Sequence, residues 1–385
     1  MKQLRVLAPG RINLLGEHLD YNQGIVLPAA IDRCIEFDFK EIHGSTVLIE
    51  ALDLNEQWEF SWDELNDSLT TGWKTYIKGV FLLMGFDSHS ALGLHIRFKS
   101  NIPIGAGLSS SAALCCGLAY GLNEFYALGK TRMELALLSQ QTEHQFAGVK
   151  CGLMDQVASL FGQANHLLAF DCISNEIMPF ALPLNGAQLF LIDSKVKHNL
   201  ASSAYNERRA SMEKAWELAQ VLFPNLKNWR DLKPTELARL NSNLDATTQN
   251  RLRYVIEEIA RVKAVQKLAN ELALLSPDQN PEALLAQLGA YLNQTHEGLR
   301  DLYEVSCREL DFLQEAICAQ KGVLGARMMG GGFGGCLLVL SHASFSISTT
   351  IALIADRYQK EFDGSVQYYP IQIAAGVKLE LLSSF

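Results

Sequence analysis

Hydrophobic and polar residues alternate along several stretches of the first hundred residues. Apolar and polar positions alternate from Arg33 to Glu41, and the runs 46–52 and 57–60 continue the pattern. Leu4 to Ala8 and Leu92 to Lys99 add two further strand-like segments. Because a period of two residues places apolar side chains on one face of a sheet, we expect antiparallel strands with one solvated face.

Longer apolar stretches and capping signals predict helices. Residues 111–126 are apolar nearly all round, which is typical of a helix buried between layers. Thr131 with Glu134 three residues later forms a capping box for a helix that ends before Gly148. The same reasoning predicts helices at 72–84, through much of 205–275, at 281–292 and at 299–321, and strands at 166–170, 188–192 and 337–340.

Length and a change of composition predict two domains. The chain has 385 residues, whereas a typical domain has roughly 150. The strand-rich beginning gives way to a charged, helix-rich region from Tyr205 onward, and turn residues gather between Asp171 and Pro183. We therefore expect one domain over residues 1–175 and a second over 176–385.

Composition excludes several classes of partner and site. A net charge of −9 argues against a general nucleic-acid or anionic-membrane partner, because such binding rests on a basic face. No apolar run reaches the roughly 18 residues that a membrane span needs. The eight cysteines show no C-x-x-C spacing, which disfavours a zinc cluster or a disulfide framework. With no signal-peptide pattern at the N-terminus, we expect a cytoplasmic protein with reduced thiols.

The stretch 102–113 is rich in glycine and serine and leads directly into the predicted helix at 111–126. Glycine lets the backbone approach an anion closely, and the start of a helix presents unpaired N–H groups. Serine can cap the helix or reach a metal ion. The composition fits a phosphate cradle and fits equally an ordinary capped loop before a buried helix.

Three other segments are candidates for chemistry. Residues 11–22 gather one Arg, two carboxylates, one His and two Asn, which suits a polyhydroxylated or charged ligand or simply a solvated loop. Asp155 stands before a run of small and apolar residues, where it is an N-cap or a functional carboxylate, and propensity favours the cap. The glycines of 325–336 require a close backbone approach, either to another segment or to a phosphate.

Two common nucleotide motifs fail on inspection. The Gly129-Lys130-Thr131 tripeptide matches the end of a P-loop, but Glu124 stands where the first glycine is required. Glycines in 330–335 have dinucleotide-site spacing, yet they lead into a strand instead of opening a helix. The sequence also lacks G-x-S-x-G and H-E-x-x-H, so it offers no support for a serine hydrolase or a zinc protease.

These segments, in this order, resemble the GHMP kinase family, and within it the galactokinases. Residues 10–22 are similar to the sugar signature of galactokinases, and residues 103–112 are similar to the ATP loop of the family. Further similar stretches are Glu143-His144 with 146–148, 151–156, 198–205 with Arg208-Arg209, and 299–310.

The resemblance implies transfer of the γ-phosphoryl group of ATP to the anomeric hydroxyl of galactose, with Mg²⁺ as cofactor. It implies Asp155 as the catalytic carboxylate and Arg11 as its partner. The implied sugar-binding residues are Glu17, His18, Asp20, Gly152 and Tyr205. The implied nucleotide-binding residues are Gly105, Ala106, Gly107, Leu108, Ser109, Ser110 and Ser111, and Ser111 with Glu143 would hold Mg²⁺.

The fold that the resemblance implies is α+β. It consists of an N-terminal domain like ribosomal protein S5 domain 2 and a ferredoxin-like C-terminal domain, with ATP and sugar in the cleft between them. The glycines of 330–335 would lie beside the ATP loop. We expect a monomer whose partners are the sugar and ATP, and neither nucleic acid nor membrane.

Two departures from the family pattern leave the sugar open. Most galactokinases have Thr where this chain has Leu19 and Gly where it has Gln23. Relatives that phosphorylate N-acetylgalactosamine have an aliphatic residue at the first position, so this sugar or another hexose is the alternative. A galactokinase-like sensor without efficient catalysis would lack the Ser-Ala pair of the ATP loop, whereas Ser111-Ala112 is intact. An isoprenoid kinase of the family would lack the Glu17-His18-x-Asp20 pattern that this chain has.

Overall fold

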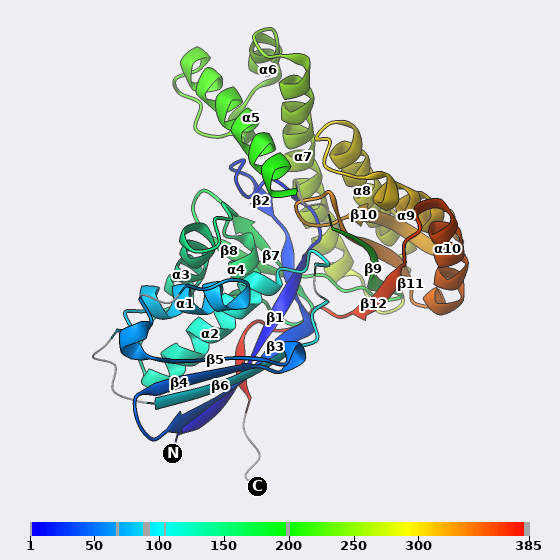
Figure 1. The fold of residues 1–385 in the computed structure, drawn as a ribbon. Coiled ribbons are helices and arrows are strands. Elements are labelled where there is room, and N and C mark those ends of the chain that lie inside the picture. The colour runs from blue at the N-terminus through cyan, green and yellow to red at the C-terminus, as the bar shows by residue number, and fades with distance from the viewer. Residues whose placement is uncertain (1, 67–68, 88–92, 104, 198–200, 381–385) are drawn as a thin grey trace.

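A six-stranded sheet forms the base of the molecule in the computed structural model, which describes residues 2–66, 69–87, 93–103, 105–197 and 201–380 (Figure 1). The strand order is β13-β1-β3-β6-β4-β5, in which β4 and β6 pair in parallel and the other neighbours pair antiparallel. The strands are β1 (Gln3–Asn13), β3 (Pro28–Ile42), β4 (Thr46–Ala51), β5 (Glu56–Ser61), β6 (Gly93–Ser100) and β13 (Lys378–Glu380).

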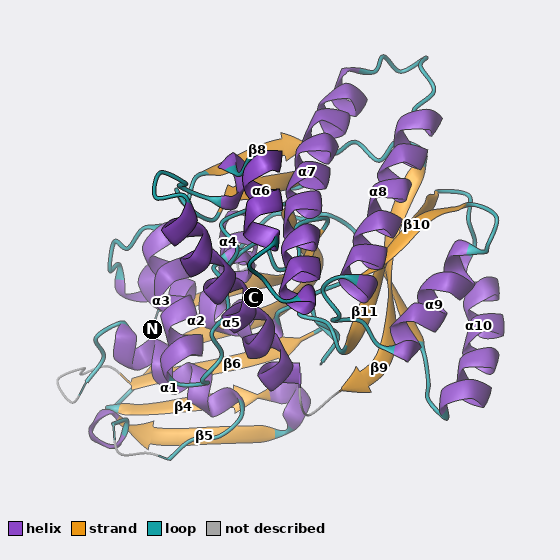
Figure 2. Ribbon diagram, turned by 90° about the horizontal axis from the view of Figure 1, so that it is seen from above, coloured by secondary structure: helices purple, strands orange, loops and turns teal. Residues whose placement is uncertain are grey.

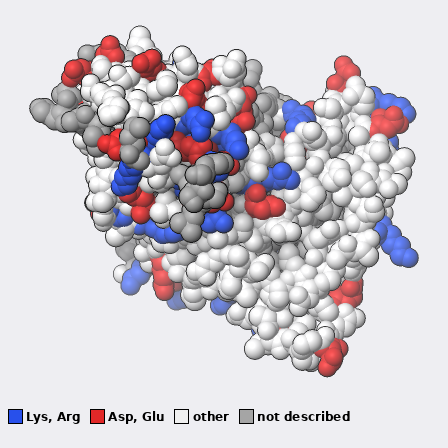
Figure 3. Space-filling model, turned by 90° about the horizontal axis from the view of Figure 1, so that it is seen from below, with Lys and Arg blue, Asp and Glu red and all other residues white. Residues whose placement is uncertain are grey.

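Helices cover one face of this sheet, and in the described part of the chain its other face has no helices over it (Figure 1). The helices are α1 (Trp73–Leu83), α2 (Ser110–Tyr126), α3 (Arg132–Gln145) and α4 (Met154–Phe161), with short 3₁₀ helices at Leu52–Leu54 and Trp62–Glu64. On the outer face Arg5 and Arg97 both pair with Asp38, at 2.7 and 3.3 Å. Figure 3 shows acidic and basic side chains interleaved on the underside of the molecule. Alternation along the strands therefore predicted a solvated face correctly.

Helix α2 lies unusually close to the sheet. A Cβ atom added at Gly117 would lie 2.4 Å from the ring of Phe37, and one added at Gly121 would lie 2.2 Å from the ring of Phe39. The two glycines are one helical turn apart, so they form a shallow groove into which both rings fit. The predicted buried helix is confirmed, and so is the capping box of α3, in which the Glu134 N–H donates to Thr131 Oγ1 at 3.2 Å.

The second half of the chain builds an antiparallel sheet with helices beside it. The strand order is β10-β11-β9-β12, and Figure 2 shows α9 and α10 on the outer side of this sheet. The strands are β9 (Ala187–Lys197), β10 (Val323–Met328), β11 (Gly334–His342) and β12 (Gln367–Ile371), and the helices are α8 (Glu282–Asp301), α9 (Arg308–Cys318) and α10 (Ile347–Phe362).

A helical projection and a small sheet complete the fold. Helices α5 (Ala201–Leu222), α6 (Pro234–Asn241) and α7 (Ala246–Leu274), with a 3₁₀ turn at Trp229–Asp231, rise at the top of Figure 1. The small sheet contains β2 (Ile25–Val26), β7 (His166–Asp171) and β8 (Ile177–Ala181) in the order β2-β7-β8. Among the described residues, the helices lack the length and apolar character that crossing a membrane requires.

The predicted helix over 299–321 is wrong. Helix α8 continues to Asp301 and α9 begins only at Arg308. Between them Glu304 has a φ of 56°, and the carbonyl of Val305 accepts a hydrogen bond from the N–H of Phe333 at 2.8 Å. A contact with the glycine segment thus replaces helical hydrogen bonds at this point. The division at residue 175 remains a prediction, and the chain crosses it again where β13 pairs with β1.

Some expectations fall on residues that are not described. They are Leu92 in the predicted strand at 92–99, Ile104 in the glycine and serine loop, and 198–200 in the stretch before Tyr205.

We expect Gly121→Ala to destabilise the protein. Alanine is a better helix former than glycine by about 1 kcal/mol, so helix propensity alone predicts stabilisation. The buried ring of Phe39 occupies the position of the new methyl group, and such overpacking costs about 1–3 kcal/mol. Urea unfolding should show a lower free energy of unfolding for Gly121→Ala than for the wild type.

A double variant separates the clash from other effects of this substitution. Phe39→Leu removes ring atoms next to Gly121, so the cost of Gly121→Ala should be smaller in that background. A Gly121→Ala protein at least as stable as the wild type would contradict the close packing.

Candidate active site

A cavity of about 180 Å³ lies where β1, α4 and the glycine segment at 330–331 meet. The seven residues predicted for catalysis and sugar binding all contribute to its lining: Arg11, Glu17, His18, Asp20, Gly152, Asp155 and Tyr205. These residues are up to 194 positions apart in the sequence. The structure therefore brings the predicted set together in one place.

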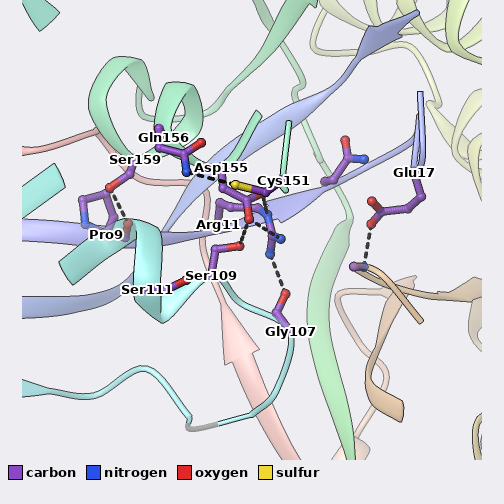
Figure 4. Close-up of polar contacts among 12 residues, drawn as sticks. Pro9, Arg11, Glu17, Gly107, Ser109, Ser111, Cys151, Asp155, Gln156 and Ser159 are labelled. Carbon is purple, nitrogen blue, oxygen red and sulfur yellow. Dashed lines mark hydrogen bonds and ion pairs between the residues drawn. The ribbon is translucent and has the colours of Figure 1, made fainter. Parts of the chain in front are cut away.

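An ion pair between Arg11 and Asp155 occupies the centre of the site (Figure 4). Arg11 Nε lies 2.7 Å from Asp155 Oδ1, and Arg11 Nη2 lies 3.1 Å from Oδ2, so the pair is bidentate. The third guanidinium nitrogen donates to the carbonyl of Gly107 in the glycine and serine loop. Burial alone would lower the pKa of Arg11, but the charges of Asp155 and Glu17 outweigh burial, and the pKa is raised. The arginine is therefore a fixed cation.

Asp155 is not an N-cap, so the interpretation that propensity favoured is wrong. The N-cap residue of α4 is Leu153, and Asp155 lies in the first turn with its side chain turned toward Arg11 and Ser109. Helix α4 is itself tied to β1, because Ser159 Oγ donates to the carbonyl of Pro9 at 2.8 Å (Figure 4). This contact fixes the position of α4 relative to β1, so that Asp155 in the first turn of α4 lies beside Arg11.

Ser109 occupies the N-cap position of α2 without capping it. Its φ is 56°, its side chain makes no capping hydrogen bond, and its hydroxyl donates to Asp155 Oδ2. The first N–H groups of α2 therefore have no side-chain cap from Ser109. They remain suited to an anion at the positive end of the helix dipole.

The two glycine-rich segments lie against each other. A Cβ atom at Gly107 would be 3.5 Å from the carbonyl oxygen of Met329, and one at Gly335 would be 3.5 Å from that of Ala106. Gly107 and Gly330 both have left-handed backbones, with φ of 71° and 80°. The predicted proximity of these two segments is confirmed. Few side chains separate the loop from the glycine segment.

Ser111 and Glu143 form a small hard-oxygen site beside the loop. Ser111 Oγ donates to Glu143 Oε1 at 2.6 Å, and Gln156 donates to the other carboxylate oxygen. Glu143 is buried, and burial with the nearby charge of Asp155 raises its pKa to about 7. The described residues contain no cluster of three or more His, Cys, Asp or Glu side chains that could hold a metal by themselves. One carboxylate and one hydroxyl nevertheless fit Mg²⁺, which commonly takes its remaining ligands from phosphates and water.

Glu17 and His18 contribute to the lining of the cavity together with Arg11 and Asp155. Glu17 Oε1 accepts from the N–H of Gly330 at 2.7 Å and from Arg327 Nη2 at 3.1 Å. His18 Nδ1 pairs with the hydroxyl of Tyr21 at 2.7 Å, while its Nε2 is buried with no hydrogen-bond partner among the described residues. Burial and the charges of Arg208 and Arg327 lower the pKa of His18 to about 3, so the ring is neutral. Its free nitrogen can pair with a hydroxyl.

Asp20 and Gly152 lie against each other in the wall of the cavity. A Cβ atom at residue 152 would lie 2.1 Å from Asp20 Oδ2, so only glycine leaves room for the carboxylate. Burial and the charges of Asp155 and Glu17 raise the pKa of Asp20 to about 7. Asp20 can therefore accept or donate a hydrogen bond near neutral pH.

Sequence reasoning missed Arg327. Its side chain is fully buried and donates to the carbonyls of Leu14 and Asn13 and to Glu17. Arg327 lies in the glycine segment at 325–336, and the sequence alone assigned it no function. An arginine among apolar residues and glycines signals a buried cation in need of acceptors, but the pattern does not say which acceptors.

Leu19 and Gln23 do not contribute to the lining of the cavity. Leu19 is fully buried and packs against Gly24, where an added Cβ would be 2.6 Å from the Leu19 Cβ. Gln23 has a φ of 59°, a conformation that glycine adopts at lower cost. The two departures from the family pattern therefore concern loop packing and backbone conformation.

Comparison with known proteins covers nearly the whole chain. The model of the GHMP kinases N terminal domain matches residues 75–163, the galactokinase galactose-binding signature matches 2–36, and the GHMP kinases C terminal model matches 282–346. A galactokinase of Thermotoga petrophila is 38% identical over 378 residues, covering 97% of this chain and 99% of its own. One of Thermosipho africanus is 37% identical over 375 residues, with the same coverage.

Solved structures agree with these matches. Galactokinase of Lactococcus lactis, complexed with galactose, has a TM-score of 0.87 at 30% identity, covering 98% of this chain and 95% of its own. Mevalonate kinase of Methanococcus jannaschii has a TM-score of 0.66 at 17% identity, covering 97% and 98%, and thus shares the fold.

We expect stability to fall as pH rises through the titration range of Asp20. Its pKa is about 7 in the folded protein and 3.8 ordinarily, so between these values the folded state holds a proton that the unfolded chain has lost. The free energy of unfolding therefore decreases from about pH 4 to about pH 7, and Glu143 acts in the same direction. Asp20→Asn removes one of these contributions.

Urea unfolding of wild type and Asp20→Asn at about pH 5 and about pH 8 measures this difference. The variant should lose less stability between the two pH values. Asp278→Asn, at an exposed position, controls for the change in net charge. The same pH dependence in wild type and Asp20→Asn would show that Asp20 titrates normally.

Proposed function

We propose that this chain phosphorylates the anomeric hydroxyl of galactose with ATP. The premise is its family: the chain belongs to the GHMP kinases and, within them, to the galactokinases. GHMP kinases use ATP as phosphoryl donor. The ion pair between Arg11 and Asp155 is the observation that best supports the roles proposed here for individual residues. It connects the sugar end of the cavity with the glycine and serine loop.

Asp155 would accept the proton of the sugar hydroxyl. Arg11 and Ser109 hold its two oxygens, so the carboxylate has a defined direction before substrate arrives. A loose phosphoryl-transfer transition state asks little of the nucleophile, so positioning and charge contribute more to the rate than basicity does.

Arg11 would stabilise the transferred phosphoryl group. Its guanidinium lies between Asp155 and the carbonyl of Gly107, next to the start of α2. A buried cation at this point can stabilise negative charge with little reorganisation. Residues 105–111 would bind the nucleotide phosphates through their N–H groups, because the side chains of Ala106 and Leu108 are buried in the core.

Ser111 and Glu143 would hold Mg²⁺, which, when bound, neutralises charge on the phosphates and orients them. Their oxygens already lie 2.6 Å apart. The raised pKa of Glu143 supports the assignment, because a buried carboxylate without a cation is costly to ionise.

The sugar would lie among Glu17, His18, Asp20 and Tyr205, above Gly152. Glu17 uses Oε1 for Gly330 and Arg327, which leaves Oε2 for a hydroxyl. His18 offers its unpartnered Nε2, and its ring lies 5.6 Å from the ring of Tyr205. This dense set of donors and acceptors suits a molecule with a hydroxyl on nearly every carbon.

A sugar panel decides the substrate. Galactose, N-acetylgalactosamine, glucose, 2-deoxygalactose and arabinose are compared by ADP release, and galactose should give the highest kcat/KM. Because Leu19 is buried outside the cavity lining, we do not expect it to admit an N-acetyl group. A preference for N-acetylgalactosamine would overturn the substrate, and sugar binding without turnover would favour a sensor.

We also propose that the active unit is a monomer in the cytoplasm. All eight cysteines are free thiols, which fits a reducing compartment. Sedimentation of the pure protein tests the first part of this proposal.

We expect Asp155→Asn to lower kcat by a factor of about 100 or more and to leave the KM for ATP nearly unchanged. Asparagine keeps the shape of the side chain but cannot take the proton. Initial rates with galactose, at varied ATP, measure both constants. Glu217→Gln, an exposed change on α5, is the control. Near-normal turnover of Asp155→Asn would exclude Asp155 as the catalytic carboxylate.

We expect Gly152→Ala to raise the KM for galactose about tenfold. This factor corresponds to the loss of about one hydrogen bond between Asp20 and the sugar. The new methyl group displaces the carboxylate of Asp20, whereas the glycine and serine loop keeps its contacts. The KM for ATP should therefore change little. Equal changes in both constants would indicate a general disturbance of the fold.

A further inference from the structure

Helix α7 holds the backbone of the loop between β1 and β2, residues 14–24, which carries Glu17 and His18 and is called the sugar loop here. The contacting residues of α7 and of this loop are more than 230 positions apart in sequence. Glu258 Oε1 accepts a hydrogen bond from the N–H of Gly16 at 2.7 Å. The hydroxyl of Tyr254 donates to the carbonyl of Glu17 at 2.9 Å. Tyr254 and Glu258 are one helical turn apart, so one face of α7 contacts two consecutive residues of the loop.

Glu258 is a fully buried carboxylate with three donors. Besides Gly16, Thr295 Oγ1 on α8 donates to its Oε2 at 2.8 Å, and Arg261 Nε donates to the same oxygen at 2.7 Å. A buried ion pair is weak evidence for stability, because apolar residues of similar volume often do as well or better. An apolar residue, however, leaves the Gly16 N–H without an acceptor.

Gly16 starts the turn that carries the sugar-binding side chains. Its φ is 99°, and an added Cβ would lie 3.0 Å from both the carbonyl of Ile25 and the Cα of Val26. Its carbonyl accepts from the N–H of Leu19 at 3.0 Å, which closes a turn over residues 17 and 18. Gly16 is thus wedged between β2 and Glu258, and its position sets where the turn begins.

We propose that Glu258 is a positioning residue of the sugar site. By fixing the Gly16 N–H from α7, it orients the turn that presents Glu17 and His18 to the cavity. Tyr254 assists by holding the next carbonyl. Glu258 touches neither the cavity nor the glycine and serine loop, so its effect is on sugar binding and not on ATP. The inference rests on the proposed function in one respect, that the ligand of the cavity is a sugar.

Glu258→Gln tests this proposal in the full-length protein. Glutamine preserves size but replaces one carboxylate oxygen with an NH2 group. If the NH2 faces Gly16, the Gly16 N–H has no acceptor; if it faces Arg261, the contact that holds the side chain against Gly16 is lost, so either orientation loosens the turn. The KM for galactose should rise by about tenfold or more, as expected for one lost buried hydrogen bond, while the KM for ATP stays within about twofold. A purely structural role would not separate the two substrates.

The adjacent residue provides a matched control. Glu257 is also on α7, is half-buried, and pairs with Arg253 at 2.7 Å and Arg261 at 3.5 Å. Glu257→Gln makes the same chemical change without touching the loop, so both KM values should remain as in the wild type. A similar rise in the galactose KM from both variants would overturn the proposal.

Tyr254→Phe keeps the test decisive if Glu258→Gln does not fold. It removes only the hydroxyl that contacts the Glu17 carbonyl, and it should raise the galactose KM several-fold with the ATP KM unchanged. If Glu258→Gln folds, an unchanged galactose KM, or equal changes in the KM values for galactose and ATP, overturns the inference. If it does not fold, the same results with Tyr254→Phe overturn it. Wild-type protein that fails to phosphorylate galactose would instead overturn the proposed function.

Discussion

The buried guanidinium of Arg11 is the contact on which the rest of the site depends. It pairs with Asp155 at the start of α4 and with the Gly107 carbonyl before α2, so one side chain sets the distance between two helix starts. The backbone adds a further contact, from the Arg11 N–H to the Leu108 carbonyl at 3.2 Å. Beside this contact β1 has a bulge at Gly10, where a Cβ would lie 2.8 Å from the Leu108 carbonyl. Bulges commonly re-aim a side chain next to an active site, and here the bulge turns Arg11 inward.

The proposed sugar site around Glu17 depends on the second half of the chain. Arg327 and Gly330 hold the carboxylate of Glu17, and Tyr303 contacts the side chains of Tyr21 and Asn22 at 3.1 Å. The signature at residues 10–22 therefore belongs to the first half of the chain, whereas the side chains that hold it in place come from the second half. The strand β13, which pairs with β1, ties the two halves together from the C-terminal end. The proposed sugar site is complete only when both halves are folded and docked.

Burial, together with neighbouring carboxylates, explains the electrostatics of the cavity and of the Ser111–Glu143 site beside it. Asp155 has the Arg11 guanidinium as its partner and Glu17 has Arg327, whereas neither Asp20 nor Glu143 has an ion-pair partner among the described residues. The pKa values of Asp20 and Glu143 accordingly rise to about 7. The Ser111–Glu143 pair suits a cation, and the cavity wall at Asp20 suits the hydroxyl groups of a neutral ligand. Electrostatics thus distinguish the cavity from the Ser111–Glu143 site beside the glycine and serine loop.

Local sequence determined the elements and most of the candidate site. The alternation in β3, the apolar run of α2 and the Thr131–Glu134 capping box act over a few residues, so they can be read without a structure. The motif residues from Arg11 to Tyr205 were found because their spacing resembles a family. Tertiary structure alone decided that Ser109 turns from its helix to Asp155, that the helix predicted over 299–321 breaks at Val305, and that Arg327 and Glu258 support the sugar loop. The reason is distance along the chain: these contacts join residues from 28 to more than 300 positions apart, and no local periodicity records which distant donor or acceptor a buried polar group will meet.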